Sequence, residues 1–105
     1  MEIAMTTTET LKSKPDDADL GFGTIFTDYM FNMDYDPDKG WHAPRIEPYE
    51  AIKMDPATMF LHYGQGVFEG LKAYRTKSGR IQLFRPQENL KRLNRSSRRL
   101  CIPEV

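Results

Sequence analysis

The sequence predicts an α+β fold, in which several antiparallel strands accompany one main helix. Two segments lead to this expectation. Residues 71–76 and 80–84 alternate apolar and polar side chains around the short loop "KSG", which is the pattern of a β-hairpin. Residues 85–100, "RPQENLKRLNRSSRRL", place leucines at helical spacing and therefore predict the helix.

The predicted helix carries typical signals along its length. Pro86 suits the first helical position, and Glu88 suits the first turn, where the helix dipole favours an acid. The sequence "CIP" then ends the helix. One face carries residues spaced by three, four and three: Leu90, Leu93, Ser97 and Leu100.

The first two thirds of the chain predict further strands. Residues 23–36 are rich in β-branched and aromatic residues with partial alternation, which predicts a strand. "DPDKG" at residues 36–40 predicts a turn, and the two prolines of residues 41–50 predict an extended segment at a sheet edge. Residues 58–64 predict a short buried strand. Residues 64–70 predict either a single helical turn or an irregular bend.

The composition changes near residue 20. Residues 1–20 are polar and rich in Thr, Lys and Asp, so we expect a disordered tail. Residues 21–105 are expected to form one small domain. The chain stops at "RRLCIPEV", directly after the predicted helix and without a polar tail. We therefore expect the fold to be incomplete, with a larger domain absent.

Charge and cysteine content exclude several classes of function. Fifteen Lys and Arg balance fifteen Asp and Glu, so a net charge of +0 gives no bulk attraction for nucleic acid or an anionic membrane. The single cysteine, Cys101, allows neither an internal disulfide nor a four-cysteine zinc site. The sequence shows no signal peptide and no run of about 20 apolar residues. We expect a cytoplasmic protein with no nucleic-acid or membrane partner.

Two groups of chemically useful side chains have plain alternatives. His42 and His62 have no cysteine or carboxylate at ligand spacing, so no metal site is expected. The arginines of residues 92–99 form either a solvated face or an anion site, in which one guanidinium binds a phosphate through its fork. Composition alone does not say which arginine would do so.

The segment "HYGQGVFEGLKAYR", residues 62–75, combines glycines with large aromatic rings. Tyr63, Phe68 and Tyr74 fit a packed core, but the glycines between them also let a ligand approach the backbone. A pocket with apolar rings and accessible amides suits an amino acid with an aliphatic side chain. On spacing alone, a core and a ligand pocket both stay open.

Together these motifs resemble the N-terminal part of branched-chain amino acid aminotransferases, which are fold-type IV pyridoxal 5'-phosphate (PLP) enzymes. The resemblance rests on "HYGQGVFEGLKAYR" followed by "GRIQLFRPQENLKRLNRSSRRLCIP". It begins near Leu20 with "LGFGTIFTDYMFNMDYD" and runs to Val105. The fold that it implies is the small N-terminal domain of such an enzyme. The upstream string resembles the larger branched-chain subgroup more than D-amino-acid aminotransferase, which shares the fold.

The resemblance implies roles for five positions. Arg92, in "NLKR", matches the arginine that holds the cofactor phosphate. Phe68 matches an aromatic residue that lines the pocket for the substrate side chain. Tyr63 matches a tyrosine that reaches the active site of the neighbouring subunit, and Gly70 and Lys72 match positions beside the substrate. The glycines would then bend the chain so that the rings face a branched aliphatic side chain.

The resemblance also implies an activity that this chain does not complete alone. The family transfers the amino group of leucine, isoleucine or valine to 2-oxoglutarate, and the full-length protein is expected to be a homodimer. The lysine that binds PLP lies in the larger domain of these enzymes, and none of the lysines here matches it. We expect no catalytic residue within this chain. The alternatives are a non-catalytic α+β binding module and a nucleic-acid module that uses the arginine-rich helix.

Overall fold

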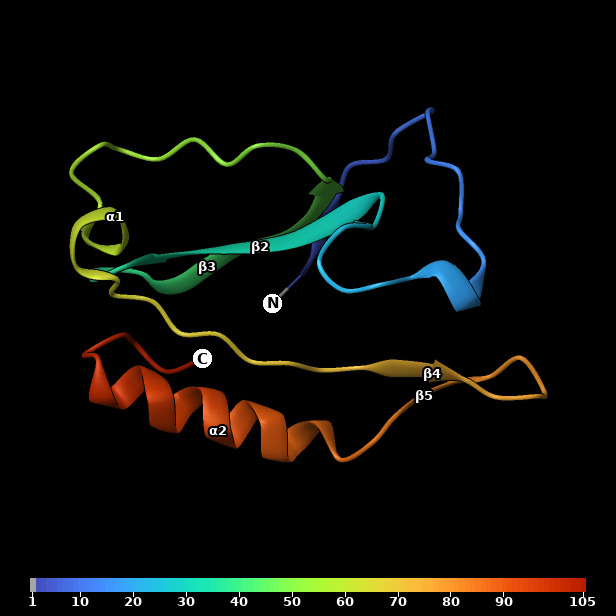
Figure 1. Ribbon diagram of the computed structural model, residues 1–105. Helices are drawn as coiled ribbons and strands as arrows, with labels where there is room; N and C mark the ends of the chain where they lie inside the picture. Colours follow the sequence, from blue (N-terminus) through green and yellow to red (C-terminus); the bar gives the residue numbers. More distant parts are fainter. Residues whose placement is uncertain (1) are drawn as a thin grey trace. The chain divides into compact units, whose positions relative to one another are not determined.

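The structure, a computed structural model, describes residues 2–105 and falls into two compact units. One unit ends at Lys53, and the other runs from Met54 to Val105. The first holds a three-stranded sheet, and the second holds a two-stranded hairpin and the longest helix (Figure 1). The predicted small α+β fold with one main helix is confirmed at this level.

The first unit is built on a β-hairpin of β2 (Tyr29–Asp36) and β3 (Gly40–Pro48). The turn between them is the one that "DPDKG" predicts: Gly40 has φ +68°, and the Lys39 N–H donates to the Asp36 carbonyl at 3.1 Å. The strand begins at Tyr29, not at residue 23 as the sequence predicts. Gly23 has φ +71°, a conformation that extended strands do not use.

The prediction that residues 41–50 lie at a sheet edge is wrong. A short strand β1 (Ala4–Met5) pairs in parallel with Arg45 and Ile46, so β3 is the central strand of the order β1-β3-β2. Pro44 is tolerated there because the register with β2 shifts between residues 32 and 34, at a bulge. The parallel pair also departs from the expected antiparallel set.

The residues of β1 fall inside the segment that the sequence predicts to be a disordered tail. Further along that segment, the Lys12 backbone N–H donates to Asp28 Oδ1 at 2.8 Å. The division into residues 1–20 and 21–105 stays a prediction.

The second unit opens with a short helix, α1 (Met59–Tyr63), where the sequence predicts a buried strand; that prediction is wrong. A turn starts the helix, since Thr58 donates its N–H and its hydroxyl to the Asp55 carbonyl at 3.0 and 2.7 Å. Gly64, in the left-handed conformation, ends it. In an apolar run as short as residues 58–64, periodicity alone does not distinguish a strand from a helix.

The predicted hairpin and main helix are both confirmed. Strands β4 (Ala73–Arg75) and β5 (Ile81–Leu83) pair antiparallel, and the Thr76 N–H closes the loop on the Arg80 carbonyl at 2.9 Å. Helix α2 (Pro86–Arg99) begins with its proline in the first turn. Residues 65–72 form no helix or strand, which agrees with the irregular-bend alternative.

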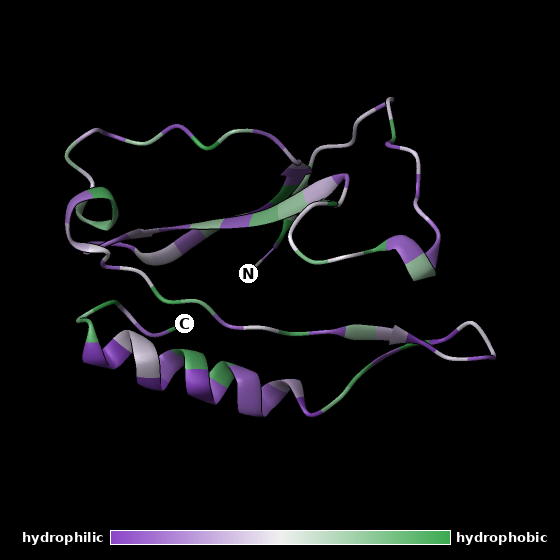
Figure 2. Ribbon diagram, in the orientation of Figure 1, coloured by the Kyte–Doolittle hydropathy of each residue, from purple (hydrophilic) through white to green (hydrophobic). Residues whose placement is uncertain are grey.

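Little of the apolar surface is covered. Among residues 2–105 no hydrophobic side chain is buried, and only Pro44 and Ser97 reach that level. Figure 2 shows hydrophobic residues spread along strands, loops and α2. Leu90, on the predicted apolar face of α2, is half exposed. No helix in the described range is long and apolar enough to cross a membrane.

Candidate functional site

The bend at Glu69 and Gly70 is fastened to the first half of α2. The Asn89 side-chain amide donates to the Gly70 carbonyl at 2.7 Å and to Glu69 Oε1 at 3.1 Å. The Gly70 N–H also donates to Glu69 Oε1, at 3.0 Å. One helix residue therefore holds both the backbone and the carboxylate of the bend.

Arg92, one helical turn beyond Asn89, closes the arrangement with an ion pair. Its Nε donates to Glu69 Oε2 at 2.6 Å, and its Nη2 donates to Glu69 Oε1. The Glu69 side chain is only 10% exposed, whereas that of Arg92 is 59% exposed. The carboxylate is thus enclosed while the guanidinium still reaches solvent.

The hydrogen bonds set the protonation state of this pair. Those from Arg92 lower the pKa of the Glu69 carboxyl to about 2, against an opposing effect of desolvation. The Asn89 amide acts in the same direction as Arg92. The same pairing raises the pKa of the Arg92 guanidinium above its ordinary value. Both groups are charged at neutral pH.

Beyond Glu69, Arg92 borders a hollow on the surface of α2. The hollow has a volume of about 530 Å³ and is lined by Arg92, Arg95, Ser96, Arg98 and Arg99. Four guanidinium groups around one depression create a local positive potential on a chain that is neutral overall. This arrangement can bind an anion, which is the second of the two interpretations that composition left open for the arginine-rich helix.

Three of the predicted substrate residues are exposed and take no part, within residues 2–105, in these hydrogen bonds. Phe68 is 89% exposed and Tyr63 is 78% exposed, and Lys72 is also exposed. Within residues 2–105, no hydrogen bond or ring contact joins any of the three to Arg92. Among the described residues, Gly70 is the one predicted substrate residue that hydrogen bonds connect to Arg92, through Glu69 and Asn89. The roles of all five residues stay predictions.

The glycines of residues 62–75 differ in what the backbone requires of them. Gly64 has φ +61°, a conformation that residues with a side chain rarely adopt. A Cβ at Gly66 would lie 2.6 Å from Cδ2 of the Phe60 ring. Beside Gly70 the space is open. The irregular backbone of residues 64–70 therefore depends on Gly64 and Gly66, whereas Gly70 leaves room for another group.

Sequence reasoning missed Glu69 and Asn89. Two signals point to them. Asn89 and Arg92 are three residues apart and therefore share a face of the helix. Glu69 is the one acid in a segment of glycines and apolar residues, and an acid that folding encloses needs a cation or donors.

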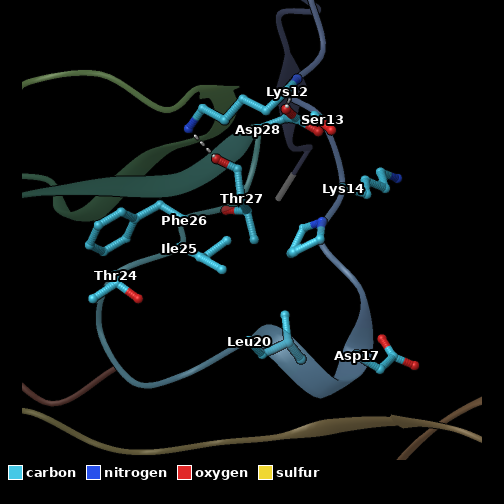
Figure 3. Close-up of a pocket in the computed structure, with 11 residues that line it drawn as sticks. Lys12, Ser13, Lys14, Asp17, Leu20, Thr24, Ile25, Phe26, Thr27 and Asp28 are labelled. Carbon is cyan, nitrogen blue, oxygen red and sulfur yellow. Dashed lines mark hydrogen bonds between the residues drawn. The ribbon is translucent and has the colours of Figure 1, made fainter.

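Another hollow, of about 630 Å³, lies in the first unit between residues 12 and 28 (Figure 3). Leu20, Ile25 and Phe26 give it an apolar wall. The Lys12 ammonium group donates to the Thr27 carbonyl at 2.9 Å and lies 4.6 Å from the centre of the Tyr49 ring. None of the five predicted site residues lines this hollow. No three His, Cys, Asp or Glu side chains gather at metal-binding distance in the described range.

The chain matches known proteins over almost its whole length. It is 56% identical, over 98% of its residues, to branched-chain-amino-acid aminotransferase 2 of Bacillus subtilis, and 61% identical, over 90%, to branched-chain-amino-acid transaminase 1 of that organism. It is 52% identical over 84% of its residues to the branched-chain-amino-acid aminotransferase of Mycolicibacterium smegmatis. All three of these relatives carry the name of a branched-chain-amino-acid aminotransferase or transaminase. No family model matches the chain.

These matches to branched-chain-amino-acid aminotransferases confirm the resemblance that the motifs indicate. The chain spans about a quarter of the relatives' length, namely 28%, 26% and 24% of the three named above. The similarity therefore concerns one part of a branched-chain-amino-acid aminotransferase.

Proposed function

We propose that this chain supplies the phosphate-anchoring and substrate side-chain part of a branched-chain amino acid transaminase, a PLP enzyme of fold-type IV. The observation that carries the proposal is the Arg92 fork on a surface of clustered arginines, next to the open space at Gly70. The identity of 52–61% to branched-chain-amino-acid aminotransferases supports it. The activity is proposed for the complete gene product.

The donor set beside Arg92 fits a phosphate group. A guanidinium has five N–H donors, and Glu69 accepts from two of them. The other three have no acceptor within residues 2–105. Arg95 and Arg99 border the same hollow, and neither has an acidic partner in this part of the chain. Guanidinium groups suit phosphate because they can donate two parallel hydrogen bonds.

The remaining site residues would bind and orient the substrate. When bound, PLP supplies the electron sink that lets the α-proton of an amino acid leave. Phe68 would offer an apolar surface to the branched side chain, and Gly70 would leave room beside it. One methylene in an apolar pocket changes binding by about 1–3 kcal/mol. The enzyme should therefore accept leucine, isoleucine and valine, with modest differences among them.

The proposal includes a homodimer. Tyr63 is exposed, and in this proposal it reaches the active site of a second copy. Tyrosine suits this position because its ring gives apolar contact while its hydroxyl can form a hydrogen bond. A Tyr63→Phe variant keeps the ring but lacks the hydroxyl, so it separates the apolar contact from the hydrogen bond.

Transamination by the complete gene product tests the proposal. With PLP and 2-oxoglutarate, each of leucine, isoleucine and valine should yield glutamate, with kcat/KM values that differ by roughly 200-fold or less. D-Alanine serves as the control substrate and should not react. Turnover of D-alanine without turnover of L-leucine would instead identify a D-amino-acid aminotransferase and overturn the proposal.

A further inference from the structure

We propose that Glu69 is a positioning residue, which fixes the Arg92 guanidinium in the orientation that receives a phosphate. The inference rests on the proposed function, because the phosphate is that of PLP. The resemblance assigns no role to Glu69. In this inference, Glu69 acts by orienting Arg92 and not by binding the substrate.

The geometry of the ion pair leaves one edge of the guanidinium available. Glu69 takes the side edge, formed by Nε and Nη2, with both carboxylate oxygens. No residue within 2–105 binds the end edge, formed by Nη1 and Nη2. Because a guanidinium is planar and rigid, holding one edge also fixes the direction of the other. The carboxylate and a phosphate can thus bind Arg92 at the same time.

Glu69 is itself held firmly enough to act as an anchor. Its Oε1 accepts from the Gly70 N–H and from the Asn89 amide at 3.0 and 3.1 Å, and its side chain is 10% exposed. Asn89 is in turn bound to the Gly70 carbonyl at 2.7 Å. Glu69 is therefore fixed to the backbone of the bend. Because it orients Arg92 before the phosphate binds, binding does not cost the rotamer freedom that a free arginine would lose.

The other arginines of the hollow show why Arg92 is distinct. Arg95 and Arg99 have no carboxylate partner within residues 2–105. Arg98 has one, since its Nε and Nη2 donate to the two Glu104 oxygens at 2.8 and 3.0 Å. That pair has the same form and uses an arginine of the same helix, with its carboxylate beyond the end of α2, but it involves neither Glu69 nor the bend. It provides a matched control.

The test compares PLP with pyridoxal, which lacks the phosphate, as ligands of the complete gene product. Dissociation constants are measured for wild type, Glu69→Gln and the control Glu104→Gln. We expect Glu69→Gln to weaken PLP binding by roughly tenfold, because hydrogen bonds to a charged group orient Arg92, and to leave pyridoxal binding unchanged. Glu104→Gln should change neither constant.

A second variant makes the test independent of how well Glu69→Gln folds. Asn89→Ala retains the ion pair but removes a donor that holds Glu69, and should weaken PLP binding in the same direction by a smaller factor. Glu69→Asp, which keeps the charge on a shorter side chain, should retain part of the preference for PLP.

Four outcomes would overturn the inference. Tighter PLP binding in Glu69→Gln would show that the carboxylate competes with the phosphate. Equal losses for PLP and pyridoxal would show a general structural role. Unchanged binding of both ligands in Glu69→Gln would remove Glu69 and leave the proposed function intact, whereas a wild type that binds both ligands equally would remove phosphate anchoring itself.

Discussion

Glu69 illustrates how a single side chain takes its properties from neighbours that lie far away in sequence. Arg92 and Asn89 reach it across 23 and 20 positions, and Gly70 reaches it from the next residue. Each donor stabilises the ionised carboxylate over the protonated form. The charge of Glu69 and the direction of Arg92 therefore depend on each other.

The stability that the Glu69–Arg92 ion pair contributes depends on pH. The pKa of Glu69 is about 2 in the folded chain and near its ordinary 4.5 when unfolded. The ionised carboxylate thus contributes stability above pH 4.5, and the contribution is lost as the pH falls from there toward 2. At pH 4 the ¹³C NMR shift of the Glu69 carboxyl should still be that of a carboxylate. A titration midpoint near 4.5 would contradict the ion pair.

Phe68 makes a separate residue-scale prediction. Its ring is 89% exposed, so Phe68→Ala should change the free energy of unfolding of this unit by about 0.5 kcal/mol or less. In the complete gene product it should raise KM for leucine by roughly tenfold, since an apolar contact to the side chain is removed. Phe22→Ala, a change at a ring that is 97% exposed in the other unit, is the control. Unchanged kinetics would remove Phe68 from the pocket.

At the scale of elements, α2 begins under strain. Arg85, the residue before the helix, has φ +47° and makes no side-chain cap. A non-glycine residue in this conformation costs about 1–2 kcal/mol. The exposed ion pair of Arg85 with Glu88, at 3.9 Å, offsets little of that cost.

Replacing Arg85 should therefore stabilise the protein. Asparagine tolerates the left-handed conformation better than arginine, so Arg85→Asn should raise the free energy of unfolding by about 1 kcal/mol. Chemical denaturation of the complete gene product measures this. Arg80→Asn, the same substitution at a position without positive φ, should stay within about 0.5 kcal/mol of wild type. A destabilising Arg85→Asn would show that the arginine has another role.

The elements that the sequence predicts correctly are those with local signals. The β4–β5 hairpin follows from its loop, and α2 follows from Pro86 and leucine spacing. The central position of β3 depends on a two-residue strand from the distant N-terminus, which no local pattern indicates. Likewise, the proposed role of Arg92 comes from its motif, whereas its pairing with Glu69 requires the bend and α2 to be in place.

At the scale of the whole molecule, uncovered apolar surface is the main feature. No hydrophobic side chain is buried among residues 2–105, and Phe60, Leu61 and Leu83 are about half exposed. Burial of apolar groups is the main favourable contribution to folding. The elements are thus formed, but the chain supplies little of the packing that would hold them.

The isolated 105-residue chain should behave accordingly. It should bind a hydrophobic dye and unfold on heating without a sharp transition, because no packed core resists the loss of structure. With PLP, leucine and 2-oxoglutarate it should form no glutamate. Dye fluorescence, calorimetry and a coupled glutamate assay measure these three properties. Cooperative unfolding or robust turnover by the purified chain would contradict this view.

The most direct test of the central claim is a crystal structure of the complete gene product with PLP bound. The account predicts a phosphate oxygen about 2.7–3.2 Å from the end edge of the Arg92 guanidinium, with Glu69 still on the side edge. A phosphate held entirely by other residues, with Arg92 paired only to Glu69, would contradict it.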